Sequence, residues 1–145
     1  MARRALIALA AVALLARGAG AQVATINGVM TGPILDDTPG AFKLMRADLR
    51  QLVKAQEGWK AEHHEYGSAL RRTGKGGVHL DPSPGVKIEL LYVTRESWVG
   101  RATHRAVKGK SCVIIVGAVP DSRMPKTRKD SALPTRAGEP TCDAE

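Results

Sequence analysis

One amphipathic stretch, residues 42–70, constrains the fold more than any other part of the chain. Its apolar side chains recur at steps of three and four, which places them on one face of a helix. Thr38 and Pro39 suit the cap and the first turn, and Tyr66-Gly67 ends the predicted helix. This apolar stripe consists of Phe42, Met45, Leu49, Leu52, Val53 and Trp59. Gln56 occupies a position within the stripe, and His63 continues it toward the end of the helix.

Three later segments have the apolar patterns of strands: residues 86–94, 97–106 and 112–119. Short links join them, which predicts an antiparallel meander. In the first strand, one face is predicted to carry Val86, Ile88, Leu90 and Tyr92. In the second, Gly100 and Ala102 leave room for the helix to lie close above. Residues 78–80 are a candidate short edge strand.

These elements predict an α+β domain, because the helix can bury its stripe only against strands. We expect one long N-terminal helix packed on a small antiparallel β-meander of three to four strands. The polar segment after residue 119 has no period and would not order alone. It is predicted to become a disulfide-pinned C-terminal loop across one edge of the sheet.

The first 21 residues have the pattern of a secretory signal peptide. Arg3 and Arg4 precede an apolar run over residues 5–16, and small residues follow at 19–21. The run is about a dozen residues, whereas a membrane-spanning helix needs roughly 20. We therefore expect cleavage after residue 21 and no stable membrane span, with a retained signal anchor as the alternative. Residues 22–37 are predicted to be a flexible lead-in, and residues 38–145 the globular domain.

Cys112 and Cys142 are the two cysteines of the chain. Export places them in an oxidising compartment, where pairing is expected. A two-cysteine metal site would need two further ligands, and the sequence offers no Cys-x-x-Cys motif and no suitably spaced His pair. The sequence therefore predicts a Cys112–Cys142 disulfide, and it predicts neither a metal nor another cofactor.

Basic residues dominate the charge of the chain, which is +8 at neutral pH. Loss of the signal would remove three arginines and no acid, which lowers this value by three, to +5. Two clusters stand out: Arg71, Arg72 and Lys75, and Arg123, Lys126, Arg128 and Lys129. Each is interpreted as a solvated loop or as a contact site for an anionic surface polymer. Aromatic residues make up 3% of the chain, too few for a base-stacking nucleic-acid platform.

No motif indicates an enzyme. Glu62-His63-His64-Glu65 groups catalytic residue types, but adjacent histidines on a helix point about 100° apart and chelate one ion poorly. No serine lies in a Gly-x-Ser-x-Gly elbow. Gly74-Lys75-Gly76-Gly77 lacks the spacing of a phosphate-binding loop. We therefore predict no catalytic residues.

The helix, the meander that follows it and the C-terminal segment together resemble bacterial type IV pilins and pseudopilins. The pattern from Asp48 to Tyr66 is similar to the exposed half of their long helix, in which an aromatic residue commonly holds the place of Trp59. The segments 109–112 and 138–143 are similar to the two ends of their disulfide-bounded loop. The resemblance covers residues 41–143, but the chain lacks the long apolar run, with its glutamate, that precedes this helix in the family.

This resemblance implies a secreted or periplasmic, envelope-associated structural domain that acts by surface contact. Assembly, adhesion and service to a secretion system are its expected roles, with protein partners from a pilus or secretion assembly. The contact surface is expected first on the loop between the cysteines and then on residues 71–77. The alternative function is a small periplasmic module that binds an anionic ligand or polymer through the two basic clusters.

Overall fold

Helix α1 (Thr38–His63) is the long element against which the other elements pack. The computed structural model describes residues 38–144, so the predicted signal and lead-in lie outside the described residues. The helix ends earlier than Tyr66-Gly67. His64 donates its N–H to the Lys60 carbonyl at 2.8 Å and then takes a left-handed backbone with φ 61°. That conformation ends a helix.

The predicted stripe of α1 is buried along most of its length. Phe42, Met45, Leu49 and Leu52 are fully buried, and so is Gln56. Trp59 is partly buried against the same core. His63 does not extend the buried stripe as predicted, because it is exposed and stacks on the Trp59 ring instead, with 3.8 Å between ring centroids.

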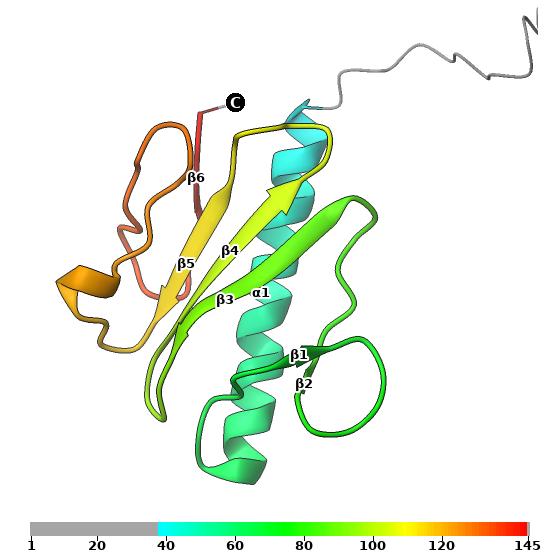
Figure 1. Ribbon diagram of the computed structural model, residues 1–145, viewed down its shortest axis with the longest axis vertical. Coiled ribbons are helices and arrows are strands. Elements are labelled where there is room, and N and C mark those ends of the chain that lie inside the picture. Colours follow the sequence, from blue (N-terminus) through cyan, green and yellow to red (C-terminus); the bar gives the residue numbers. More distant parts are fainter. Residues whose placement is uncertain (1–37, 145) are drawn as a thin grey trace, which may run out of the picture. The chain divides into compact units, whose positions relative to one another are not determined.

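The predicted antiparallel meander is confirmed as a four-stranded sheet in the order β3-β4-β5-β6. The strands are β3 (Val86–Val93), β4 (Trp98–His104), β5 (Cys112–Val116) and β6 (Thr141–Cys142). Helix α1 crosses one face of this sheet, as Figure 1 shows. Trp98, Ala102 and Ile114 complete the core there. A Cβ at Gly100 would lie 3.3 Å from Leu52, so the small residue does allow the helix to lie close.

The opposite face of the sheet is also covered. Val99 and Val113 alternate with the core residues of their strands and are nevertheless fully buried. A register shift in β3 pairs Tyr92 with Val99, so the prediction that Tyr92 shares the face of Leu90 is wrong. The short helix η1 (Asp121–Arg123) places the Arg123 guanidinium 5.8 Å from the Tyr92 ring. The C-terminal loop therefore reaches across this outer face.

Residues 64–85 connect the helix to the sheet and carry a feature that the sequence analysis missed. The strands β1 (Leu70–Arg71) and β2 (Val78–His79) form a separate parallel pair, so residues 78–80 are not an edge strand of the meander. Two buried polar side chains of α1 hold this connector. Gln56 accepts from the Gly67 N–H and donates to its carbonyl, both at 2.9 Å.

Asp48 forms the second polar attachment of the connector. Its carboxylate accepts the Ser83 N–H at 2.7 Å and the Ser83 hydroxyl at 2.8 Å. The carboxylate is 2% exposed, so these two bonds replace those it would make to water. Because Ser83 lies in the turn before β3, Asp48 positions the start of the sheet on the helix.

We expect Gln56→Leu to lower the free energy of unfolding by about 1–3 kcal/mol, because it leaves the buried polar groups of Gly67 without partners. Urea unfolding followed by tryptophan fluorescence measures this loss. Gln51→Leu is the matched control, since Gln51 is exposed on the same helix. Equal losses in the two variants would contradict a specific role for the Gln56–Gly67 bonds.

The disulfide yields a second prediction. Replacing Cys112 and Cys142 together with alanine opens a loop whose ends are 30 residues apart. The chain-entropy model then gives a loss of about 3–4 kcal/mol in the free energy of unfolding. Denaturant unfolding of the variant, compared with the oxidised and the reduced, alkylated wild type, checks the value. A variant as stable as the oxidised protein would contradict it.

Candidate functional site

The disulfide joins two strands that lie side by side. Cys112 and Cys142 are bonded as predicted, and they face each other in the register of β5 and β6. Asp143 follows directly and donates its N–H to the Ser111 carbonyl at 3.0 Å. The end of the chain is therefore fastened to β5 both covalently and by backbone hydrogen bonds, which confirms the disulfide-pinned loop.

A buried carboxylate holds the middle of this loop. Asp143 is 1% exposed, and its oxygens accept the backbone N–H groups of Ser111, Lys129 and Asp130 at 2.7, 3.0 and 2.7 Å. Burial raises the pKa of Asp143, but the hydrogen bonds from Asp130, Thr127, Ser111 and Lys129 outweigh burial and lower that pKa below its ordinary value. The charged form of Asp143 therefore stabilises this part of the loop.

The same network brings a loop arginine next to the β4–β5 turn. The Ser111 hydroxyl accepts the Arg128 N–H at 2.9 Å. Lys110, beside Ser111, donates its ammonium to the Ala144 carbonyl at 2.8 Å. Arg128 and Lys110 are far apart in the sequence, but the Ser111 hydroxyl holds the Arg128 backbone beside Lys110, the residue that precedes the serine.

Around this point lies a hollow of about 350 Å³, which we call the basic hollow. Five cationic side chains line it: Lys87, Arg105, Lys108, Lys110 and Arg128. No aspartate or glutamate is among its lining residues within the described range. The basic hollow is thus a concave, positively charged surface, suited to an anion.

Two further groups near the basic hollow have defined roles. His104 accepts the Ala106 N–H on Nδ1 at 3.1 Å, so its Nε2 carries the proton that faces the Pro84 carbonyl at 3.3 Å. Glu89 forms an ion pair with Lys87, with 2.6 Å between the ammonium and the carboxylate. The Lys87 hydrogen bond is the main cause that lowers the pKa of Glu89.

The structure separates the predicted C-terminal cluster. Arg128 alone lines the basic hollow, while Arg123 lies over Tyr92 on the outer face of the sheet. Lys126 and Lys129 are exposed, and Lys129 contributes its backbone N–H to the Asp143 network. These four cations therefore do not form a single site.

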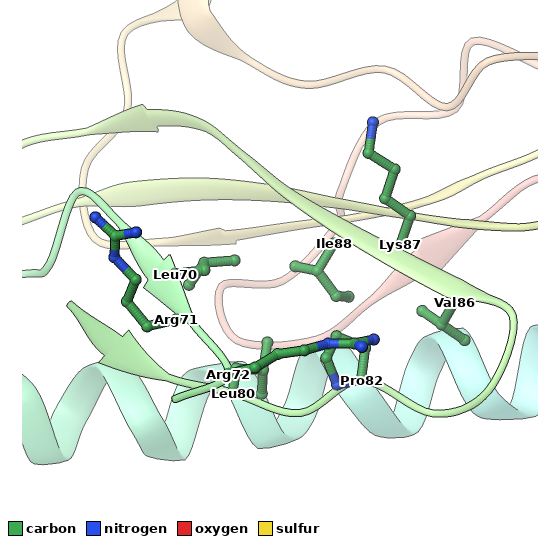
Figure 2. A pocket seen from close by; sticks show the side chains of 8 residues that line it. All are labelled: Leu70, Arg71, Arg72, Leu80, Pro82, Val86, Lys87 and Ile88. Atoms are coloured by element: carbon green, nitrogen blue, oxygen red, sulfur yellow. The ribbon is translucent and has the colours of Figure 1, made fainter. Parts of the chain in front are cut away.

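The predicted connector cluster borders a second, smaller hollow of about 220 Å³ between β1 and the start of β3. Its lining includes the apolar residues Leu80 and Ile88 together with Arg71 and Arg72. Figure 2 shows that Ile88 and Lys87 leave β3 on opposite sides. Arg72 is 3.5 Å from the Asp81 carboxylate, so its charge is partly balanced. Lys75 is exposed in the loop between β1 and β2.

Sequence reasoning missed four of the five cations of the basic hollow. Lys87, Arg105, Lys108 and Lys110 belong to neither of the two predicted basic clusters. The signal lay in the predicted pairing, because an antiparallel hairpin brings residue 87 opposite Thr103, close to Arg105. The nearness of Arg128 had no such signal, since it depends on the Asp143 network.

The Glu62-His63-His64-Glu65 cluster forms no joint site. The His63 ring forms a hydrogen bond with the Trp59 carbonyl and stacks on the Trp59 ring. His64 ends the helix. Nearby, burial and the hydrogen bond to Glu57 raise the pKa of Tyr66 to about 12. Within residues 38–144, no three His, Cys, Asp or Glu side chains are placed to share a metal ion.

Comparison with protein-family models, curated proteins and solved structures found no match. In the described range, α1 is not apolar enough to span a bilayer.

We expect Asp143→Asn to lower stability at neutral pH and to flatten its acid dependence. The folded-state pKa of Asp143 lies below its unfolded value of about 4, so its contribution is present above that value. It is lost as the pH falls through the folded-state pKa. Urea unfolding from about pH 7 to about pH 3 follows this loss.

Asp121→Asn is the control for the acid-dependence experiment, because Asp121 is exposed in η1. It should keep the acid-dependent loss of the wild type. The same pH profile in the wild type and in Asp143→Asn would show that the Asp143 carboxylate does not hold the loop as a charged group.

Proposed function

We propose that this chain is a secreted or periplasmic, envelope-associated structural and interaction domain, similar to the globular part of a pilin or pseudopilin. It acts by surface contact, in assembly, adhesion or service to a secretion system, and not as an enzyme. Its proposed partners are proteins of a pilus or secretion assembly.

The observation that supports this proposal most is the arrangement of the three parts that carry the resemblance. The long helix α1, the antiparallel sheet and the loop between Cys112 and Cys142 occur in that order in one domain. The disulfide supports an oxidising location, where such bonds persist.

The C-terminal loop is the proposed contact surface. It includes Leu133, a residue that is 46% exposed, the higher of the two values for large exposed apolar residues in the described range. Cys112–Cys142 and the buried Asp143 hold both the ends and the middle of the loop. A loop held in this way loses little further conformational entropy when it binds a partner.

In the native bacterium, a photo-crosslinking residue at position 133 is expected to give adducts of discrete mass in the envelope fraction. The same residue at position 62, exposed in the last turn of α1, is the matched control. Mass spectrometry should identify the adducts as components of an envelope assembly or as a second copy of this chain. Thiol trapping in the same cells should find both cysteines oxidised.

Free thiols in the mature protein, or adducts only with cytosolic proteins, would contradict the proposed function. Equal adducts from positions 133 and 62 would contradict the loop as the contact surface while leaving the location intact. The two parts of the proposal are thus tested separately.

A second candidate function is the binding of an anionic ligand or polymer. The basic hollow favours anion binding, because Arg128 and four further cationic residues line it. Salt-dependent retention on an anionic matrix is the expected behaviour. Absence of retention at low salt would remove this function.

A further inference from the structure

We propose that the basic hollow is a binding site for a ligand that carries several closely spaced phosphate groups. The inference rests on the second candidate function, anion binding, and adds the location of the site and the chemical class of its ligand. It replaces the two predicted basic loops with one surface built from β3, the end of β4, the β4–β5 turn and the C-terminal loop.

The charge of the basic hollow is only partly compensated. Lys87 pairs with Glu89 at 2.6 Å, and the Lys110 ammonium bonds the neutral Ala144 carbonyl and lies 5.5 Å from the centre of the Phe42 ring. In the part of the chain that the structure describes, no hydrogen bond or ion pair occupies the side chains of Arg105, Lys108 or Arg128, although Arg128 is close enough to the Glu89 carboxylate to help lower its pKa. An anion in the hollow would relieve the mutual repulsion of these cations.

The backbone of the site is fixed before any ligand arrives. Ser111 accepts the Arg128 N–H, Asp143 accepts the Ser111 N–H, and the disulfide holds the adjoining strands. His104 fastens the start of β3 to the end of β4 through the Pro84 carbonyl. Binding therefore has to order only the cationic side chains, which reduces its entropic cost.

The number and type of the cations indicate phosphate. A carboxylate carries one charge, whereas a terminal phosphate carries about −1.5 to −2 at neutral pH. Several phosphates can thus balance the three cations whose side chains make no hydrogen bond or ion pair, Arg105, Lys108 and Arg128, within a hollow of about 350 Å³. The guanidinium groups of Arg105 and Arg128 match phosphate oxygens in pairs, and the lysines act as point charges. Such groups occur in a soluble phosphate chain and on a phospholipid surface.

Calorimetric titration of the oxidised protein with tripolyphosphate tests the proposal. One ligand should bind per chain, and affinity should fall as salt rises. Arg105→Glu combined with Lys108→Glu should weaken binding by at least about tenfold, since it reverses two of the exposed charges at the site. Lys43→Glu combined with Arg50→Glu is the control, since both residues are exposed on α1 and the charge change is the same.

Two further arms identify the ligand class and its source. Citrate, with three carboxylates, should bind more weakly than tripolyphosphate. Phosphatidylcholine vesicles with and without phosphatidic acid test whether the phosphate groups belong to a lipid surface. If they do, the protein should bind the acidic vesicles, and tripolyphosphate should displace it from them. NMR amide shifts on adding tripolyphosphate should concentrate at residues 87, 105–110 and 128.

Each contrary result overturns a defined part of the proposal. Equal loss of tripolyphosphate affinity in both double variants would show that the ligand responds to the net charge of the protein and not to a defined site. Citrate binding as tight as tripolyphosphate would overturn the phosphate class. Retention on an anionic matrix without saturable tripolyphosphate binding would overturn the site while leaving the second candidate function in place, and absence of both would remove the two together.

Discussion

Burial of one helix stripe against β4 is the interaction on which the rest of the domain depends. Phe42, Met45, Leu49 and Leu52 are removed from water there, and each contributes roughly 1.5–3 kcal/mol relative to an exposed side chain. Gly100 makes the close approach of the helix possible, because a larger residue would meet Leu52 and Ile114. With the helix on one face, the C-terminal loop is left to cover Val99 and Val113 on the other.

Apolar burial alone would not place the connecting segments, and three buried polar side chains do so. Gln56 and Asp48 hold the connector to the helix, and Asp143 holds the C-terminal loop to β5. Each bonds backbone groups that strand pairing leaves free. The loops of this domain are consequently positioned by specific hydrogen bonds, and the proposed surfaces lie on the segments that these bonds fix.

The two proposed activities use different consequences of this arrangement. Contact with a protein partner uses the exposed part of the C-terminal loop around Leu133, whereas phosphate binding uses its junction with the β4–β5 turn, where Arg128 meets Lys110. Both depend on the Cys112–Cys142 bond and on the Asp143 network. Oxidation of the cysteines would therefore be needed for either function.

Local pattern and the presence of two cysteines were enough to predict the helix, the meander and the disulfide. The helix end was misplaced because His64 adopts a left-handed conformation that its residue type does not announce. The face of Tyr92 was wrong because a register shift depends on the partner strand. The parallel pair β1–β2 was missed because two-residue strands have no readable period.

The sequence by itself determined which side chains are apolar, how they recur and which cysteines were available to pair. These properties depend on residues close together in the chain, so periodicity reveals them. Only the tertiary structure decided which cations share the basic hollow. Arg128 reaches it because a buried carboxylate at residue 143 and a serine at residue 111 hold its backbone. That arrangement needs three segments to meet in space, and no local pattern records such a meeting.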